Sequence, residues 1–504
     1  MSAEITPVTE WPDYSVDPQG GNPITQDLNA PYDKGDLCWV LVSTILCWQI
    51  TPAIGFLYAG MHRRKSALTM VFQSLFCACA CGVQFWVYGY SLYQSRAANA
   101  VLGDLSLAAL HNVLAAPSLA NPDIPDILYA AFGCTFVTAT AMILAGAMLE
   151  RGRMWPSMLF LLCWTTFVYY ILAYWEWNPN GWLYNLGVYD FAGSGPVHIA
   201  SGFGALAWSI MLGPRISHEP GSGGAAVPAS RSERKRQAAV HFKPHNPFLV
   251  GLGTVFIWFG WYAFNGASTA NLSLRSIYVV VNTNLAACGG GLGWQLLEYA
   301  HSGKFSIVGF CSGIISGLVG ITPAAGYVPV YVAVLIGLLT AAACFYVTRY
   351  KYLIPAVDEG LDIFAIHGVG GVVGDVLTGL FAAGWVPALD GVSGDTYEGG
   401  WWDHNWRQLG LQLAAAATCA SWSFCVSCIL LFVINKIPGL HLRVREEDEI
   451  RGLDYKYFSD LEGEGGESAG ILTPFVEGVP FETRGASERS LAPAVVAEGG
   501  GKRD

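Results

Sequence analysis

The feature that most constrains this chain is a long apolar stretch that recurs along most of its length. A helix needs about 20 mostly apolar residues to cross a lipid bilayer. Of the 504 residues, 53% are hydrophobic and 13% are charged, which is more apolar sequence than a soluble core absorbs. The sequence therefore predicts an all-α polytopic membrane protein with eleven transmembrane helices, near residues 36–60, 66–94, 124–149, 155–177, 190–213, 247–265, 277–300, 305–322, 328–348, 363–385 and 407–436.

The charged residues divide the chain into three parts. Residues 1–35 hold one Lys against six acids, and residues 437–504 hold eight Lys or Arg against fourteen acids. The net charge of −11 therefore belongs to the two ends, and residues 36–436 are neutral as a whole. We expect an N-terminal segment (1–35), a transmembrane domain (36–436) and a regulatory tail (437–504). The neutral middle of the chain offers no basic patch for nucleic acid, so we expect no nucleic-acid partner. The apolar spans predict contact with membrane lipid.

Basic residues in the loops predict the orientation. With an odd number of spans and the N-terminus outside, fourteen Lys and Arg fall in inner loops. Only three fall in outer loops, Arg96, Arg275 and Arg407. Because cytosolic loops carry the excess of basic residues, the sequence predicts an N-out and C-in topology, with an extracellular N-terminal segment and a cytosolic tail.

The polar inner segments have two kinds of composition. The loop 214–246 is rich in Gly, Ala and Ser and then basic, which is typical of a solvated linker. Residues 445–460 are consistent with one charged helix, and the sequence beyond them has the composition of disorder. Ser459 lies among acids, where an acid-directed cytosolic kinase would add charge beside the basic residues of the tail.

Two histidines lie well inside predicted spans, where titratable residues mark transport paths or buried pairs. His198 is in the fifth span and His367 in the tenth, each with Gly four residues later. An acid precedes each of them at the start of its span, Asp190 and Asp362. If the first ten spans form two inverted five-helix repeats, followed by an eleventh helix, the two histidines meet near the midplane. A structural role remains the alternative for either histidine alone.

Two facing neutral imidazoles would line a narrow path without adding a fixed charge. A bare cation entering such an apolar path loses hydration worth tens of kcal/mol in the idealised limit, whereas a neutral molecule of the size of water does not. The chemistry that suits the pair is removal of a proton from a cation, followed by passage of the neutral form.

Aromatic residues gather near the predicted outer ends of the spans and would stabilise a desolvated cation. A membrane-interface anchor is the alternative for any single Trp, and a helix cap is the alternative for Asp190. The thirteen cysteines lie in apolar runs and show neither a disulfide framework nor a zinc pattern, so we expect no metal and no cofactor. The candidate residues of the outer site are Phe132, Phe136, Trp177, Trp261, Phe264 and Ser268.

Four stretches carry a specific resemblance to a known family. They are WNPNGWLYNLGVYDFAGSGPVHIASGFGAL (177–206), WFGWYAFNGAS (258–268), NTNLAACGGGLGW (282–294) and DIFAIHGVGG (362–371). Together they resemble the ammonium transporter/methylammonium permease family, which also includes the Rhesus proteins, and the resemblance extends over roughly 36–460. The sequence looks most like that of a fungal permease, of the subclass that keeps both pore histidines and is credited with a nutrient-sensing role.

The resemblance implies a role for each candidate residue. Trp177, Ser268, Phe132 and Phe136 would form the outer site that recruits ammonium or methylammonium, and Phe136 and Phe264 would stack as a gate beneath it. His198 and His367 would be the twin pore histidines, and Asp190 would hold the recruitment region and assist deprotonation. The family also implies a plasma-membrane homotrimer with one pore in each subunit.

Three other functions are alternatives to ammonium transport with net charge movement. A receptor that binds ammonium without useful flux needs only the outer site, so the intact histidines favour transport. A Rhesus-type ammonia gas channel is disfavoured by the combination of Trp177 and Ser268. An intramembrane hydrolase is the least favoured, because the spans contain no HExxH motif and no obvious pair of nucleophile and base. The sequence therefore predicts a transporter and not an enzyme.

Overall fold

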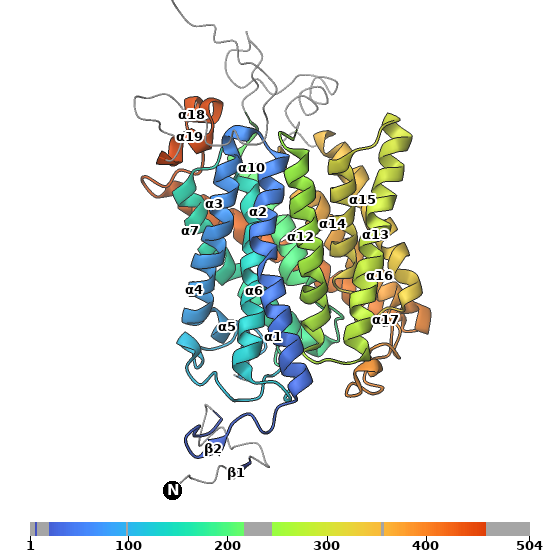
Figure 1. Ribbon diagram of the computed structural model, residues 1–504. Helices are drawn as coiled ribbons and strands as arrows, with labels where there is room; N and C mark the ends of the chain where they lie inside the picture. Colours follow the sequence, from blue (N-terminus) through green and yellow to red (C-terminus); the bar gives the residue numbers. More distant parts are fainter. Residues whose placement is uncertain (1–5, 8–19, 97–98, 216–243, 354–356, 460–504) are drawn as a thin grey trace, which may run out of the picture. The chain divides into compact units, whose positions relative to one another are not determined.

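The computed structural model describes residues 6–7, 20–96, 99–215, 244–353 and 357–459, and its long helices run side by side (Figure 1). Residues Met1–Tyr457 form one compact unit and Phe458–Asp504 a second. Most of the predicted linker 214–246 and the end of the tail lie outside the described residues.

The first half of the chain supplies the helices drawn in blue and teal (Figure 1). Several of them are built from α-helical pieces joined by short 3₁₀ or π segments. In chain order they are α1 Lys34–Trp48, α2 Ile50–Met61, η1 Arg64–Ser66, α3 Ala67–Phe76, η2 Cys77–Cys81, α4 Gly82–Gln84, η3 Phe85–Gly89, α5 Tyr90–Gln94, η4 Ala108–Leu110, α6 Asp126–Ala145, η5 Gly146–Met148, α7 Met154–Trp164, η6 Thr165–Tyr169, α8 Tyr170–Trp177, α9 Trp182–Leu186, η7 Ser194–Ile199 and α10 Ala200–Leu212.

The second half supplies the helices drawn in green, yellow and orange (Figure 1). In chain order they are α12 Pro247–Gly266, η8 Ala267–Thr269, α13 Leu274–Ser302, α14 Ile307–Ile321, α15 Val330–Tyr350, η9 Lys351–Leu353, η10 Phe364–Val369, α16 Gly370–Phe381, η11 Pro387–Asp390, η12 Trp401–Asp403, α17 Trp406–Lys436, α18 Glu446–Arg451 and α19 Leu453–Tyr457. One pair of two-residue parallel strands, β1 Thr6–Pro7 and β2 Gln26–Asp27, precedes α1.

Among the described residues, nine helical segments are long and apolar enough to cross a membrane. α13 has 29 residues but carries polar and Gly residues along its length, and α14 has only 15 residues. At 1.5 Å per residue α14 is about 22 Å long, which is shorter than the ~30 Å apolar layer of a bilayer. Both helices pack against α15, so they belong to the same bundle as the nine.

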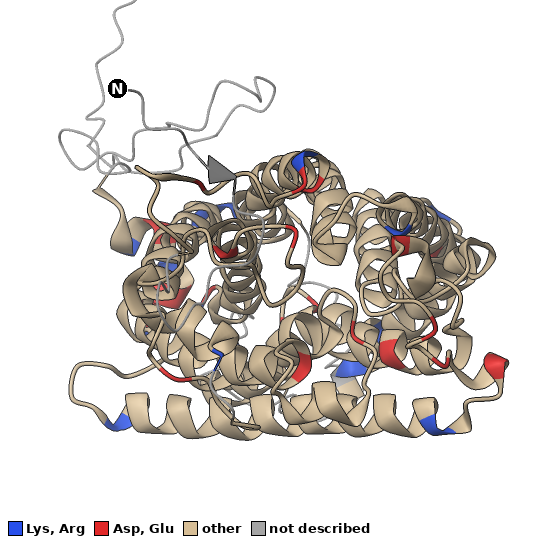
Figure 2. Cartoon of the chain, turned by 90° about the horizontal axis from the view of Figure 1, so that it is seen from below, with Lys and Arg blue, Asp and Glu red and all other residues tan. Residues whose placement is uncertain are grey.

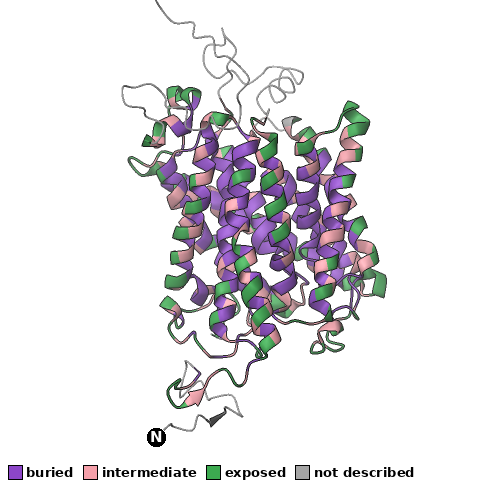
Figure 3. Ribbon diagram, viewed as in Figure 1, coloured by how far each residue is buried: buried purple, intermediate pink, exposed green. Residues whose placement is uncertain are grey.

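The distribution of burial and charge agrees with a lipid environment. Buried residues fill the middle of the bundle, while exposed ones lie on its outer faces (Figure 3). Those outer faces carry large apolar side chains, which a protein in water rarely leaves uncovered. Examples are Leu41, Ile45, Trp86, Leu296 and Phe432. Most of the ribbon carries neither acid nor base when viewed along the bundle (Figure 2).

Contacts between the two halves pair corresponding helices. α2 packs against α12, and the segment η7–α10 packs against η10 and α16. α17 packs on α10 and on α16, so it contacts the helix that follows each histidine. Both histidines therefore lie where the two halves of the chain meet.

The beginning of the tail packs against η1 and the start of α3, in two short helices instead of the one charged helix suggested by the sequence. Gly452, at φ 110°, separates α18 from α19 and breaks the helix there. The Asp454 carboxylate then accepts hydrogen bonds from the backbone N–H groups of Leu68 and Thr69, at 3.0 and 2.8 Å. These are free donors at the start of α3, so Asp454 caps a helix that is distant in sequence.

Candidate functional site

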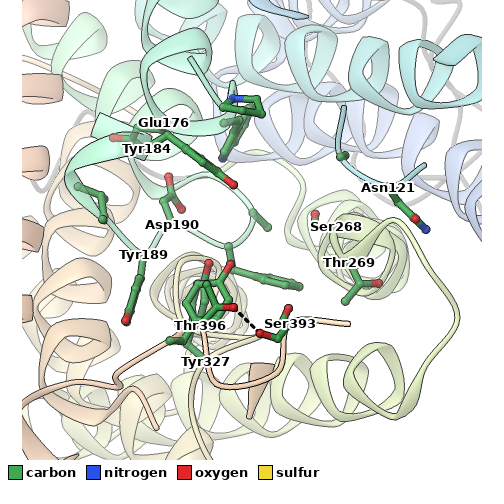
Figure 4. A pocket seen from close by; sticks show the side chains of 18 of the residues that line it. Asn121, Glu176, Tyr184, Tyr189, Asp190, Ser268, Thr269, Tyr327, Ser393 and Thr396 are labelled. Atoms are coloured by element: carbon green, nitrogen blue, oxygen red, sulfur yellow. Dashed lines mark hydrogen bonds between the residues drawn. The ribbon is translucent and has the colours of Figure 1, made fainter. Parts of the chain in front are cut away.

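A cavity of about 560 Å³ lies at one end of the bundle, next to the residues that precede η7 in the chain. Its lining includes the predicted outer-site residues Trp177, Phe132, Phe136 and Ser268, together with Asp190. Asp190 and Ser268 lie on opposite sides of the opening (Figure 4). α6, α8, η8 and the segment before η7 therefore place these residues around one space, although they are far apart in sequence.

The inner wall of the cavity is aromatic. The rings of Phe136 and Phe264 are stacked, with centroids 3.9 Å apart and planes at 19°. Trp177 contacts the edge of Phe136 at 5.9 Å, and Phe132 contacts it at 5.0 Å. Phe132, Phe136 and Phe264 are all buried, so the stacked pair closes the cavity on the side that faces the histidines.

Ser268 lies at the open side of the cavity and is partly exposed. Its hydroxyl donates to the carbonyl oxygen of Phe264 at 2.8 Å, four residues earlier. Because a hydroxyl that donates its proton still has lone pairs to accept with, the Ser268 oxygen is oriented to accept from a cationic N–H.

The two predicted pore histidines lie in contact in the buried centre of the bundle. Their Nδ1 atoms are 3.2 Å apart, and His198 and His367 are 0% and 6% exposed. Trp261 stacks on His198 at 5.4 Å and contacts Phe264 at 5.5 Å, which links the histidines to the aromatic gate. The Nε2 atom of His198 has no hydrogen-bond partner among the described groups. Such a buried nitrogen is available to a small polar guest.

Both histidines lie on π-helical segments of six residues, η7 and η10. A π turn widens the helix and leaves some backbone groups without their usual partners, and π segments are frequent at functional sites. At the start of η7, the Asp190 carboxylate accepts the backbone N–H groups of Gly193, Ser194 and Gly195 at 2.7 to 3.1 Å. Asp190 thus fixes the beginning of the segment that carries His198.

The residue that corresponds to Asp190 in the second half is Glu359, not Asp362. The Glu359 carboxylate accepts the backbone N–H groups of Ile363 and Phe364, at 2.6 and 2.9 Å. Asp362 instead pairs with Lys351. The sequence spacing could have identified Glu359, since Asp190 lies eight residues before His198 and Glu359 lies eight residues before His367.

Two glycines allow the histidine-bearing segments to cross closely. A Cβ atom on Gly202 would lie 2.1 Å from the backbone nitrogen of Gly368, and one on Gly371 would lie 3.3 Å from Cβ of His198. Any side chain at Gly202 therefore overlaps the backbone of η10, which no rotamer change can relieve. Gly202 is therefore required by this crossing, and Gly371 lies in close contact with the segment that carries His198.

Comparison with known proteins decides the family. The model of the Ammonium Transporter Family matches residues 38–462. The chain belongs to the ammonium transporter family. It is 47% identical to Ammonium transporter 1 of Schizosaccharomyces pombe over 435 residues, which cover 86% of this chain and 83% of that protein. It is 42% identical to Ammonium transporter MEP2 of Saccharomyces cerevisiae over 438 residues, covering 86% and 84%.

The crystal structure of Candida albicans Mep2 has the same fold. It superposes with a TM-score of 0.77 at 44% identity, covering 89% of this chain and 92% of that one. The family assignment and the fold expected from the sequence, a helical polytopic membrane transporter, are thereby confirmed. As a member of a transporter family, the protein is not an enzyme.

Sequence reasoning missed a charged cluster in the connections that follow α2, η5 and α10. The Glu150 carboxylate contacts Arg63 at 2.5 Å, Arg215 at 2.7 Å and His62 at 3.2 Å. Arg215 also pairs with Asp358 at 2.6 Å, close before the segment that carries His367. Burial alone would raise the pKa of Glu150, but its cationic neighbours lower that pKa well below its usual range. The cluster joins inner connections from both halves of the chain.

A second group that sequence reasoning missed lies next to the outer cavity. Glu176 directly precedes Trp177, and its buried carboxyl group lies beside Asp190. Asp375 accepts a hydrogen bond from the Ser194 hydroxyl. The sequence around Glu176 is apolar and aromatic and does not indicate that Asp190 lies next to Glu176 in the fold. Glu176 could therefore not be recognised as a site residue from its local sequence.

Proposed function

We propose that the protein transports ammonium across the plasma membrane, with methylammonium as a substrate analogue. The observation that carries the proposal is one continuous buried series of contacts. It runs from the outer cavity through the stacked Phe136 and Phe264 to Trp261 and the pair of His198 and His367. An outer cation site followed by a neutral, desolvated path suits a cation that crosses as its conjugate base.

Recruitment of the cation is assigned to the outer cavity. Trp177, Phe132 and Phe136 offer aromatic faces, which attract a desolvated cation by ~2 kcal/mol or more. The Ser268 oxygen accepts one N–H, and Asp190 holds the shape of the wall. Ammonium has four N–H donors, so it gains from an acceptor as well as from the rings.

Passage is assigned to the gate and the histidines. Ammonium gives up one proton at the outer site with the assistance of the Asp190 carboxylate: one N–H bond breaks, the electron pair stays on nitrogen, and the proton is taken up by water in the cavity. Ammonia then passes the Phe136–Phe264 gate and exchanges hydrogen bonds with His198 and His367. The proton follows by a separate relay, so that net charge moves. Potassium has no proton to lose and is excluded by its desolvation cost.

The architecture that we propose has eleven spans in two inverted five-helix repeats plus α17. Nine candidate spans, together with α13 and α14, supply this number among the described helices. The paired positions of η7 and η10 support the repeat. Exposed apolar faces suit both lipid and a homotrimer, whose mass in detergent is measurable by light scattering; a monomeric mass would contradict the trimer.

The orientation can be tested with tags. An excess of fourteen inner over three outer basic residues predicts that residues 1–35 face the medium and 437–504 the cytosol. We expect an epitope inserted at residue 5 to bind antibody on intact cells, and a C-terminal tag to bind only after permeabilisation. Protease that removes the C-terminal tag from intact cells while sparing the N-terminal one would contradict this topology.

Substitution of Trp177 tests the outer site separately from the pore. We expect Trp177→Leu to weaken the apparent affinity for methylammonium five- to thirtyfold, because it removes a cation–π contact of about 1–2 kcal/mol. Maximal uptake should change much less, since the histidines stay in place. Uptake measured over a range of methylammonium concentrations separates the two effects. An unchanged apparent affinity would show that Trp177 does not bind the cation.

Regulation of the tail is proposed to act through Ser459. Ser459 is exposed and lies among acidic residues, which suits an acid-directed kinase. A phosphate there would repel neighbouring acids or pair with Arg, and either interaction changes how the tail is held. We expect Ser459→Ala and Ser459→Asp to differ from each other in uptake at equal surface expression. Uptake equal to that of the wild type in both variants would exclude this regulation.

Growth tests the proposed function most simply. A yeast strain without its own ammonium transporters should grow on low ammonium when it expresses this chain, and should not grow with the empty vector. Growth on a nitrogen source other than ammonium, which enters by another route, controls for general fitness. Failure to grow, with the protein demonstrated at the cell surface, would contradict transport.

A further inference from the structure

Three carboxyl groups meet beside the outer cavity, and each comes from a different element. Glu176 lies near the end of α8, Asp190 precedes η7, and Asp375 lies in α16. They are 6%, 8% and 2% exposed. Glu176 and Asp190 both line the cavity, on the side opposite Ser268 (Figure 4).

The three carboxyl groups accept different numbers of hydrogen bonds. Asp190 accepts three backbone N–H groups, and Asp375 accepts the Ser194 hydroxyl. Oε1 of Glu176 accepts only the weak thiol donor of Cys419, at 3.1 Å. Its Oε2 is buried and finds no donor among the described groups.

Glu176 is also confined in position. A Cβ atom on Gly195 would lie 2.3 and 2.5 Å from its two carboxyl oxygens, so the Glu176 carboxyl rests directly on the η7 backbone. Gly195 also donates its backbone N–H to the Asp190 carboxylate at 3.1 Å, so the two carboxyl groups meet at the same residue. The described neighbours of Glu176 include Asp190 before η7, the Cys419 thiol from α17 and, next to Ser194, Asp375 from α16, and none of these supplies a positive charge.

Two carboxyl groups in contact form a hydrogen bond only if one of them carries a proton, and neighbouring carboxylates in a buried site do not both ionise. The Asp190 oxygens already accept three backbone N–H groups. Glu176, with one weak donor, is the member on which the proton belongs. A protonated Glu176 would donate from Oε2, the oxygen that otherwise has no partner.

We infer that Glu176 is held as a neutral carboxylic acid that donates a hydrogen bond to Asp190 and so positions the start of the segment that carries His198. The inference deepens the proposed function, on which it rests, because Asp190 shapes the wall of the outer site. Glu176 is a positioning residue: it acts through Asp190. Loss of its proton at alkaline pH places two carboxylates in contact and displaces η7.

The test uses two variants of Glu176 and one matched control. Glu176→Gln replaces the acid by a neutral donor of the same shape, and Glu176→Ala removes the donor. Glu398→Gln is the control, because Glu398 lines the same cavity but is exposed. One readout is the infrared C=O band of protonated carboxyl groups in the purified protein in lipid discs, which does not depend on transport. The other is methylammonium uptake against external pH, over the range in which methylammonium stays cationic.

We expect the wild type and Glu398→Gln to show a protonated-carboxyl band at neutral pH that is smaller in Glu176→Gln. Uptake by Glu176→Gln should stay near the wild-type maximum and extend to higher pH, because its amide cannot lose a proton in this way. Glu176→Ala should lose most of its maximal uptake at every pH.

An unchanged band in Glu176→Gln would overturn the inference. So would the same decline of uptake at alkaline pH in Glu176→Gln and in the wild type. If Glu176→Ala fails to reach the surface, the comparison of Glu176→Gln with the wild type decides alone. Absence of uptake by the wild type would contradict the proposed function and leave the infrared result to decide the state of Glu176.

Discussion

Replacing His198 and His367 together with serine is expected to abolish the discrimination between ammonium and potassium. The two rings fill the buried centre of the path, with their Nδ1 atoms 3.2 Å apart. Two serines would leave room for water, and a hydrated path lowers the desolvation cost that excludes a bare cation. We expect the ratio of methylammonium uptake to potassium leak to fall at least tenfold, equivalent to ~1.4 kcal/mol of selectivity.

The comparison needs matched expression and a histidine control. His441 is exposed, so His441→Ser changes a histidine without touching the path. Both variants should be assayed for methylammonium uptake and potassium leak at equal surface amounts. A double variant that keeps wild-type flux and still excludes potassium would show that the pair is not the source of selectivity, and the outer site alone would have to explain it.

Gly202→Ala is expected to remove most of the transport activity, although it adds a single methyl group. That group would lie 2.1 and 2.3 Å from backbone atoms of Gly368, so η10 must move and carry His367 with it. Overpacking of a close-packed interior costs about 1–3 kcal/mol even where side chains can adjust, and here the obstacle is backbone. We therefore expect a lower melting temperature as well as lower uptake.

Gly251→Ala provides the control for this substitution. Gly251 also lies within a helix, α12, but a Cβ atom there would meet nothing within 4 Å. Because Ala favours a helix over Gly by about 1 kcal/mol, this variant should be neutral or slightly more stable. Equal melting temperatures and uptake for the two variants would show that the crossing at Gly202 is not tightly packed.

The residues that the sequence identified well are those with a local signal. Each predicted span has a helical counterpart, since an apolar stretch of 20 residues has few other solutions in lipid. His198 and His367 stood out because titratable residues are rare inside spans. The structure brings them together, and it places Trp177, Phe132, Phe136 and Ser268 around one cavity, while their roles in transport stay a prediction.

What the sequence did not reveal depends on contacts between distant segments. Glu176 and Asp375 become neighbours of Asp190 only when α8, η7 and α16 pack together. Asp362 lies nearest the start of the tenth span in the sequence, but the backbone N–H groups of Ile363 and Phe364 are accepted by Glu359, and Asp362 pairs with Lys351. The charged cluster at Glu150 likewise gathers residues from separate inner connections, each of which looks like an ordinary polar loop.

The most direct measurement of selective ammonium transport uses the purified protein in liposomes. Equal inward gradients of ammonium and of potassium are imposed in turn, and the current and the internal pH are recorded. We expect an ammonium gradient to drive current that depends on the protein, and a potassium gradient to drive none above that of empty liposomes. Potassium current comparable to the ammonium current, or no ammonium-dependent signal from protein shown to be folded, would contradict selective ammonium transport by this chain.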